Sequence, residues 1–385
     1  MDFRDSEEQG ALRELVRRVA RERVAPRAAA IDADAAYPQD MFDMLTELGL
    51  FTIPFPPEFG GSNSILSGCI AVEELGRVCY NTAYLLVVQW VPFGAILAAG
   101  SDAQRNRYLP GLASGELRGA FSTTEPQSGS DIAGIRTRAV ECQGGYRLSG
   151  SKIWCTNSPV ADFIVVAART SDDARGAINF FIVETGATGL EIGAPERKNG
   201  ARGIPSCPLF FDDCFVPADA MLGQPRQGFS SVMEAFSISR PIIGARGVGL
   251  AQGALDHALA FVGEREAFGQ AVAQFQGIQW MLADMAIQIE AARGLVYKAA
   301  AAADTGVRGK ELGQLAAIAK CHATDTAMMV AQDAVQLFGA AGISDDYPIN
   351  RYFRDAKVLQ IVEGTNQIQR NIIGRNLVAG MRLEP

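Results

Sequence analysis

The chain has 385 residues, of which 48% are hydrophobic and 20% charged, so it is long enough for two or three domains with buried cores. Its formal net charge of −8, with 35 Lys and Arg against 43 Asp and Glu, includes no dense basic run, and this argues against a nucleic-acid partner. The two histidines, His257 and His322, lie in Ala-rich helical patterns, which argues against a His-based triad and a multi-His metal site. We therefore predict no metal.

Seven cysteines are scattered without a C-x-x-C pair, which argues against a disulfide framework or a zinc site. The first residues mix charges at helical spacing and lack the apolar stretch of a secretion signal. We also expect no uncharged apolar run of membrane-spanning length. Together these features predict a cytoplasmic protein without membrane insertion.

The first region is predicted to be helical. Between residues 5 and 117 the apolar residues recur every third and fourth position, as at Leu12, Leu15 and Val19. Pro38-Gln39-Asp40 is typical of a helix start, and Gly100-Ser101-Asp102 of a helix end followed by a new N-cap. We predict an N-terminal helical domain over residues 1–117.

The sequence pattern changes twice after this domain. Short runs such as Phe163–Ala168 and Phe180–Val183, divided by Gly, Asn, Asp and Pro, predict a central antiparallel β-domain over residues 118–225. Long Ala-rich segments at Ile242–Arg265, Phe275–Asp304 and Glu311–Phe338 predict a C-terminal four-helix bundle over residues 226–385. The predicted fold class is α+β, mainly α.

Glycines and hydroxyls provide two candidate cofactor motifs. Gly244–Gly249 lies inside a helical pattern without a preceding strand, which favours a helix-packing stripe over a phosphate loop. The loop Phe121–Asp131 carries hydroxyls and amides that can bind a heteroaromatic edge and a diphosphate, although two of these residues alone would indicate an ordinary turn. Trp154 lies two residues before Thr156, and thus on the same strand face, which suits a flat ring or else a plain core position.

One carboxylate stands out near the C-terminus. Glu363 precedes Gly364 in a helical region, where it could simply begin the following helix. Alternatively, Gly364 lets a substrate approach closely while Glu363, desolvated among apolar neighbours, acts as a base of raised pKa.

These segments together resemble the acyl-CoA dehydrogenase family, and the resemblance covers nearly the whole chain. The matching strings are T-E-P-x-x-G-S-D at 124–131, Gly150–Asn157, Arg265–Gly269 with Gln276, Asp333–Gly342 and Glu363–Arg370. The resemblance implies FAD as cofactor. It places these residues around the flavin: Phe121, Thr123, Thr124, Ser130, Trp154, Thr156, Thr365 and Gln367.

The resemblance also implies a homo-oligomer, commonly a tetramer. Residues expected at the FAD of a partner subunit are Arg265, Phe268, Gln276, Gln336, Gly339 and Ala340. Ala340 departs from the family pattern, because glycine is more usual there. Electrons would pass to an electron-transferring flavoprotein.

By the same resemblance, Glu363 removes the α-proton of an acyl thioester while hydride leaves the β-carbon for flavin N5, giving a trans-2-enoyl thioester. Some relatives place the base just before an Arg, but here that position holds Ser239, ahead of Arg240, and serine cannot serve as the base. Residues expected around the substrate are Ser130, Phe229, Met233, Ser237, Ser239, Arg240 and Gly364.

Two departures from the family pattern and three further residues bear on the substrate. Ser237 stands where an acidic residue is common, so an acyl-carrier protein remains an alternative to CoA. Val362 replaces an aromatic residue beside the base, and Trp90 and Phe93 should make the pocket shallow, which favours a short, branched or cyclic acyl group. Arg246, two turns beyond Ser239, could meet a carboxylate.

Two rival functions remain open. Flavin monooxygenases share this fold but have little use for a base at Glu363, and a catalytically silent flavin or acyl-carrier binding protein is the third alternative.

Overall fold

The computed structural model describes residues 5–172, 178–224 and 228–380. The N-terminal helices are α1 (Glu7–Val19), α2 (Ala28–Asp34), α3 (Gln39–Glu47), α4 (Ile65–Gly76), α5 (Tyr80–Ala99) and α6 (Asp102–Ser114). The strands are β1 (Gly119–Ser122), β2 (Arg138–Cys142), β3 (Gly145–Thr156), β4 (Phe163–Arg169), β5 (Ile178–Glu184), β6 (Leu190–Ile192), β7 (Ser206–Pro217) and β8 (Met221–Leu222). The C-terminal elements are α7 (Gly228–Glu264), a hairpin of β9 (Glu266–Ala267) and β10 (Gln270–Ala271), α8 (Gln276–Asp304), α9 (Gly309–Phe338), α10 (Pro348–Leu359) and α11 (Asn366–Val378).

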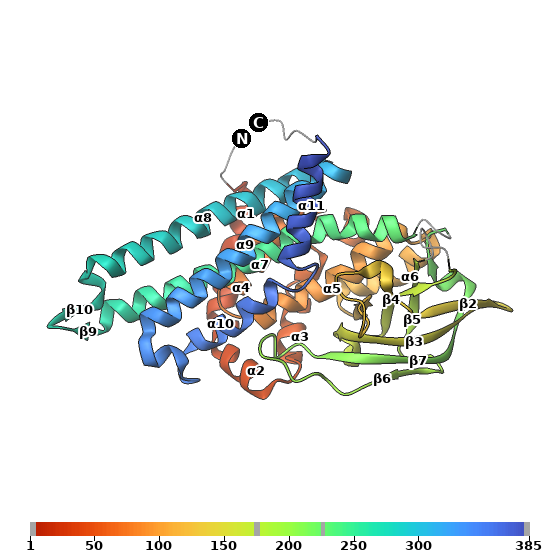
Figure 1. Ribbon diagram of the computed structural model, residues 1–385, viewed down its shortest axis with the longest axis horizontal. Coiled ribbons are helices and arrows are strands. Elements are labelled where there is room, and N and C mark those ends of the chain that lie inside the picture. The colour runs from red at the N-terminus through yellow and green to blue at the C-terminus, as the bar shows by residue number, and fades with distance from the viewer. Residues whose placement is uncertain (1–4, 173–177, 225–227, 381–385) are drawn as a thin grey trace.

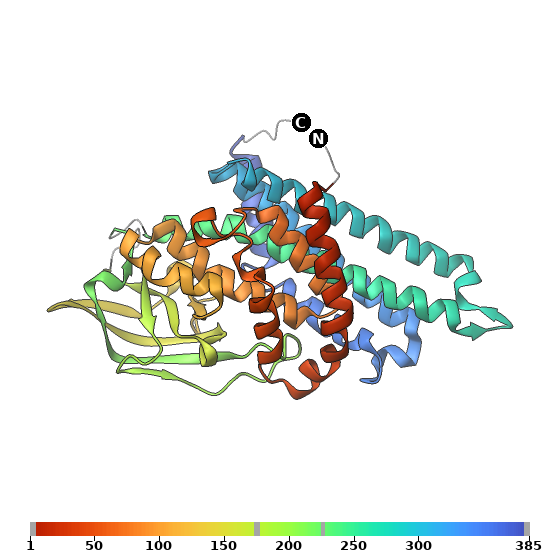
Figure 2. The ribbon, with the colours of Figure 1, turned by 180° about the vertical axis from the view of Figure 1, so that it is seen from behind.

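The molecule is elongated, with the sheet at one end and the β9–β10 hairpin at the other (Figure 1). The long helices α7, α8 and α9 run between these ends, and α1 crosses them on the opposite side (Figure 2). The predicted fold class, mainly helical with a central β-domain, is confirmed. So are the predicted helix start at Gln39 and the new N-cap at Ser101, whose side chain accepts from Gln104 N.

The sheet has the strand order β6-β7-β3-β2-β4-β5-β8, with β1 beside β4. Most neighbours are antiparallel, as predicted, but β1 and β2 each pair with β4 in parallel. The reason is topological: β3 runs antiparallel to β2 and β4 reverses the direction again, so β4 points the same way as β1 and β2. In β4, Phe163 and Val165 face the helices while Ile164 and Val166 belong to the β-domain core, so the strand is buried on both faces.

Helix α5 corrects one sequence expectation. Within the described residues it is the one helix long and apolar enough, by length and composition, to cross a membrane. Its 20 residues carry no charge, but 61% of the apolar window is buried inside the protein. Gln89 donates to Leu112 O and Leu117 O, and Trp90 Nε1 donates to Phe51 O. The apolar run therefore serves as a core helix against the neighbouring elements.

The glycines of α7 allow close helix packing. A Cβ added at Gly249 would lie 2.2 Å from Glu73 O, and one added at Gly253 would lie 2.0 Å from Arg77 O. Both carbonyls belong to the end of α4, so a side chain at either glycine would push the helices apart. The interpretation of this glycine-rich segment as a packing stripe is confirmed.

Buried carboxylates on α4 connect the N-terminal helices to the C-terminal ones. Glu74 accepts from Arg13 and Arg17 of α1, and Glu73 accepts from Arg293 of α8. Burial alone would raise the pKa of Glu74, but the bonds from Arg17 and Arg13 hold it below its ordinary value. Charges at this depth are stable because each has a partner.

Gly249→Ala should lower stability by about 1–3 kcal/mol or more, because the new Cβ meets the Glu73 carbonyl of α4. Gly294→Ala on α8 is the matched control, since its Cβ meets nothing within 4 Å and alanine favours the helix by about 0.5–1 kcal/mol. Thermal unfolding of both variants measures the difference. A Gly249→Ala protein as stable as the control would contradict the packing role.

Candidate functional site

Glu363 lies in a turn and not in a helix. Helix α10 ends at Leu359, and α11 begins at Asn366 with Thr365 as its N-cap, whose Oγ1 accepts from Ile368 N at 3.3 Å. The alternative that Glu363 simply begins the following helix is therefore wrong. Its φ is +55° and that of Gly364 is +87°, a backbone shape that side chains other than glycine rarely adopt. This turn presents the carboxylate between two helices.

Lys320 of α9 holds the turn through hydrogen bonds. Its Nζ donates to Gly364 O at 3.0 Å and to Asn366 Oδ1 at 2.8 Å. Gln369 Nε2 donates to Glu363 O at 3.3 Å and to Gly364 O at 3.0 Å. Burial lowers the pKa of Lys320 to about 8. The sequence analysis missed this residue, although a lysine on the apolar face of an Ala-rich helix was a visible signal.

The surroundings of Glu363 set its basicity. Desolvation raises the pKa of its carboxyl, while a hydrogen bond from Ser239 Oγ to Oε2 at 2.7 Å opposes the rise. The positive charges of Arg246, Arg240 and Lys320 also oppose it. A carboxylate of raised pKa is a stronger base than an exposed one, which suits removal of a proton from a weak carbon acid.

A cavity of about 490 Å³ opens beside this pair, a size that suits a small organic ligand. Ser239 belongs to its lining and therefore links the cavity to Glu363. The lining residues are Pro54, Asn63, Ile65, Val87, Trp90, Val91, Phe93, Gly94, Leu97, Ala98, Ile238, Ser239, Ile242, Ala303, Asp304 and Arg308.

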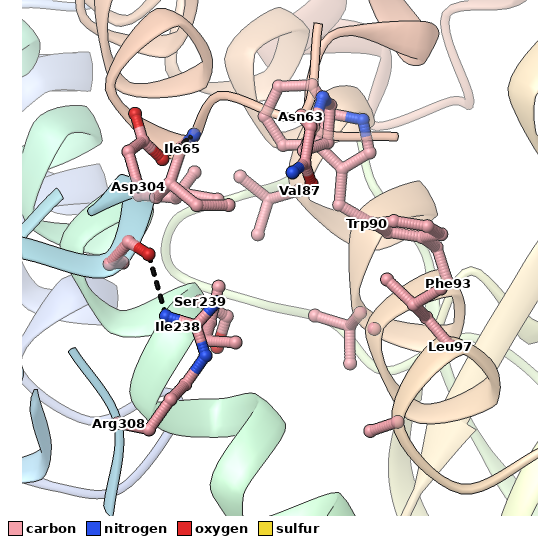
Figure 3. A pocket seen from close by; sticks show the side chains of 16 residues that line it. Asn63, Ile65, Val87, Trp90, Phe93, Leu97, Ile238, Ser239, Asp304 and Arg308 are labelled. Atoms are coloured by element: carbon pink, nitrogen blue, oxygen red, sulfur yellow. Dashed lines mark hydrogen bonds between the residues drawn. The ribbon is translucent and has the colours of Figure 1, made fainter. Parts of the chain in front are cut away.

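The cavity has one apolar and one polar side. Figure 3 shows Trp90, Phe93 and Leu97 of α5 facing Asp304 and Arg308, which flank the α8–α9 turn. Trp90 Nε1 donates a hydrogen bond to Phe51 O at 2.8 Å, which fixes the indole. The Phe93 ring stacks on the Phe55 ring with centroids 3.7 Å apart, so these walls are rigid. Asp304 and Arg308 were missed, because nothing in a helix-end D-T-G-V-R string indicates a cavity.

Some of the predicted substrate residues lie beside Glu363, and others do not. Ser239 and Arg240 lie beside Glu363, and Ser237 is 8% exposed on the same helix. Gly364 forms the turn itself, whereas Ser130 lies exposed in the loop after β1. Phe229 and Met233 are on α7, but their side chains lie outside the described residues.

The predicted flavin residues Phe121, Trp154 and Thr156 come from two neighbouring strands. Phe121 of β1 packs against the rings of Phe180 and Phe236 at 5.4 and 5.3 Å. Trp154 of β3 has φ +59°, lies at a bulge in the β3–β7 pairing and is 51% exposed. The bulge interrupts the simple alternation from which a common face with Thr156 was predicted. Thr156 Oγ1 lies 3.1 Å from Ser206 Oγ.

Comparison with known proteins decides the family. Three family models match in order: acyl-CoA dehydrogenase N-terminal domain over residues 6–116, middle domain over 120–214 and C-terminal domain over 226–378. The chain belongs to the acyl-CoA dehydrogenase family. It is similar to cyclohexane-1-carbonyl-CoA dehydrogenase of Geobacter metallireducens, with 43% identity over 98% of this chain and 99% of that protein.

Solved structures agree with this family. Butyryl-CoA dehydrogenase from Megasphaera elsdenii has 37% identity and a TM-score of 0.94, over 98% of this chain and all of that one. A complex of PigA with FAD has 28% identity and a TM-score of 0.92, over the full length of both chains. Acyl-CoA dehydrogenases are FAD-dependent oxidoreductases, so FAD is the cofactor of this fold.

The residues of this chain fit an isoalloxazine ring. Trp154 offers an exposed aromatic surface near the end of β3. Beside the predicted flavin contacts, Ser122 Oγ and Asn157 Oδ1 are buried without a hydrogen-bond partner among the described residues. Thr123 and Thr124 follow β1, and Thr124 O accepts from Ile153 N at 2.9 Å, which holds the loop against β3. Thr365 and Gln367 lie at the start of α11, next to the turn.

A buried ion pair anchors this loop, and the sequence analysis missed it. Lys152 Nζ lies 2.7 Å from Glu125 Oε1 and 3.2 Å from Thr123 O. Glu125 also accepts from Arg136 N at 2.6 Å and Thr137 N at 2.9 Å. Burial alone would raise the pKa of Glu125, but the bonds from Lys152 and Thr137 lower it to about 2. The letters E and K belonged to the matched strings, yet their pairing is visible only in the fold.

The residues predicted to meet a partner's FAD lie at the end of the molecule opposite the sheet. Phe268 is 96% exposed in the β9–β10 hairpin, far from the sheet (Figure 1). Phe338 at the end of α9 stacks on Phe261 of α7 at 4.1 Å and brings the two helix ends together. The whole exposed group is Arg265, Phe268, Gln276, Gln336, Gly339 and Ala340. The structure does not bring it to Phe121 of the same chain.

Lys152→Met should cost about 3–5 kcal/mol of stability, because it leaves the Glu125 carboxylate buried without its cation. The double variant Glu125→Gln/Lys152→Met should lose much less, since no charge remains. Because the folded pKa of Glu125 is depressed, its contribution is present above its unfolded pKa and is lost as the pH falls toward about 2. Denaturant unfolding of both variants tests this, and equal losses would contradict it.

Proposed function

We propose that this acyl-CoA dehydrogenase converts an acyl-CoA to its trans-2-enoyl thioester, with Glu363 as the base for the α-proton. The observation that carries the proposal is the Glu363 carboxyl of raised pKa, bonded at 2.7 Å to Ser239, which lines the cavity. FAD, when bound, supplies the acceptor for the hydride from the β-carbon at its N5. The predicted flavin contacts Phe121 and Trp154 support this placement.

The other residues of the site make the α-proton removable. We assign the backbone N–H of Glu363 as a donor to the thioester carbonyl, because the enolate oxygen needs a fixed donor as its charge develops. The positive charge of Arg240, partly buried near the carboxylate, adds to this stabilisation. Ser239 orients the carboxylate through its hydrogen bond and keeps it aimed at the cavity.

We propose a short, branched or cyclic acyl group. The rigid Trp90 and Phe93 walls favour a compact group, and Val362 leaves room beside the base. The similarity to cyclohexane-1-carbonyl-CoA dehydrogenase, at 43% identity, supports a ring. An acyl-carrier protein is the alternative carrier, because Ser237 is uncharged where an acid is common. The presence of Glu363 in the site argues against the monooxygenase alternative.

We further propose a cytoplasmic homo-oligomer in which a partner subunit completes the FAD site. Phe268 supports this proposal, because a 96% exposed aromatic ring on an extended hairpin is suited to a partner subunit. A tetramer and an electron-transferring flavoprotein as acceptor follow the family pattern. Analytical ultracentrifugation of the yellow protein tests the assembly.

Glu363→Gln should slow flavin reduction by about 10³-fold or more, because no base remains for the α-proton. In the native enzyme the rate of reduction should rise with pH through the raised pKa of Glu363. The same variant should be more stable than the native protein at alkaline pH. Ionising a group whose folded pKa is raised costs stability, and this cost is absent below the unfolded pKa and complete above the folded one.

Anaerobic stopped-flow bleaching of the flavin measures the rate, and thermal unfolding measures the stability. Ser239→Ala is the control, because it removes only the bond to the carboxylate and should move the pH profile upward without abolishing reduction. Native rates in Glu363→Gln would end the assignment of the base.

Cyclohexanecarbonyl-CoA and isobutyryl-CoA should be turned over with a higher kcat/KM than octanoyl-CoA, because the rigid α5 wall restricts length. Dye-coupled assays with the three thioesters measure this order, and parallel measurement of oxygen consumption separates dehydrogenation from monooxygenation. A preference for octanoyl-CoA would contradict the proposed acyl class.

A further inference from the structure

Arg246 is a buried guanidinium without acceptors. It is 0% exposed, and its Nε, Nη1 and Nη2 have no hydrogen-bond partner among the described residues. Its closest aromatic contacts are the rings of Tyr80 at 4.4 Å and Tyr84 at 3.9 Å. Aromatic rings attract a cation over their faces, but the five N–H donors of arginine lie in its own plane and need acceptors. The hydroxyl of Tyr80 is also buried without a partner.

Arg246 lies one helical turn beyond the lining of the cavity. On α7 it follows Ser239 and Ile242 at helical spacing, so the three share one face. On α5, Tyr80 and Tyr84 precede Val87 at the same spacing. Val87 and Ile242 line the cavity, and the guanidinium is packed over the rings of Tyr80 and Tyr84 one helical turn beyond them.

The charges of the site point to a second anion. Arg240 and Arg246 both act electrostatically on Glu363. Arg240 is acted on by no other carboxylate among the described residues, and its Nε also has no partner. One fully buried and one partly buried guanidinium group thus share one carboxylate, and buried charges are costly unless paired. A ligand that brings a carboxylate would correct this imbalance.

We propose that Arg246 binds a carboxylate at the end of the acyl group furthest from the thioester, so that the substrates include CoA thioesters of dicarboxylic acids. This inference rests on the proposed dehydrogenation and specifies its substrate class. The acyl group passes Val87 and Ile242 at the inner end of the cavity, and its carboxylate receives two in-plane N–H bonds from Arg246. The Tyr80 hydroxyl gives a further donor, while Glu363 remains free to take the α-proton.

Matched pairs of thioesters test this specificity in the FAD-loaded enzyme. We choose hexanoyl-CoA with adipyl-CoA, and cyclohexanecarbonyl-CoA with its 4-carboxy derivative. In the native enzyme the carboxylated member of at least one pair should have an equal or higher kcat/KM. In Arg246→Gln the kcat/KM for the carboxylated substrate, divided by the kcat/KM for the plain substrate, should fall about 10- to 100-fold. The ratio cancels any effect of Arg246 on Glu363 that both substrates share.

Two further variants make the test specific. Arg246→Lys keeps the charge without the planar fork and should give an intermediate ratio. Arg308→Gln removes the other guanidinium of the cavity and should leave the ratio unchanged. The proposal is overturned if the native enzyme rejects both carboxylated substrates, if Arg246→Gln leaves the ratio unchanged, or if Arg308→Gln is the variant that lowers it.

A binding measurement covers the case in which Arg246→Gln does not fold. Adipyl-CoA and hexanoyl-CoA are then titrated into the native holoenzyme under anaerobic conditions while the flavin spectrum is followed. Tighter or equal binding of adipyl-CoA supports the site, and binding weaker by about 100-fold overturns it. Failure of every thioester to reduce the flavin would instead refute the proposed dehydrogenation, which keeps the two failures distinct.

Discussion

The site depends on one strained backbone position. A side chain at φ +55° costs about 1–2 kcal/mol relative to ordinary backbone, so Glu363 holds this shape only because its neighbours fix it. Lys320 and Gln369 bond the carbonyls of the turn, and Thr365 starts α11 directly after it. These contacts come from α9 and α11. The position of the carboxylate is therefore a product of how the C-terminal helices pack.

The regular elements were predictable because their patterns are local. The third long helix was expected over Glu311–Phe338 and runs from Gly309 to Phe338, since Ala-rich helical periodicity needs no knowledge of distant partners. Strand direction was less predictable: β1 pairs in parallel with β4, across a hairpin that the local pattern cannot place. Helix α5 was misjudged for a related reason. Its uncharged run is apolar on all sides because protein surrounds it.

The functional residues could be recognised in the sequence, but the residues that support them could not. Glu363 attracted attention as a carboxylate beside a glycine, whereas Lys320 lies 44 residues away from the Gly364 carbonyl that it holds. Likewise Lys152 and Glu125 are 27 residues apart and meet only when β3 passes the loop after β1. Side-chain type gives the chemistry, and only the fold shows which buried charge has which partner.

The basicity of Glu363 follows from opposing effects on its pKa, which come from different helices. Burial favours the neutral acid, while the hydroxyl of Ser239 and the charges of Arg246 and Lys320 favour the carboxylate. Desolvation acting alone would raise the pKa further and favour the protonated acid, which cannot accept a proton. If a cation bonded it directly, the carboxylate would be too weak a base. Contact with a neutral hydroxyl, and cations held at a distance, keep Glu363 ionisable and basic, so its function requires α7 and α9 to remain in register with the turn.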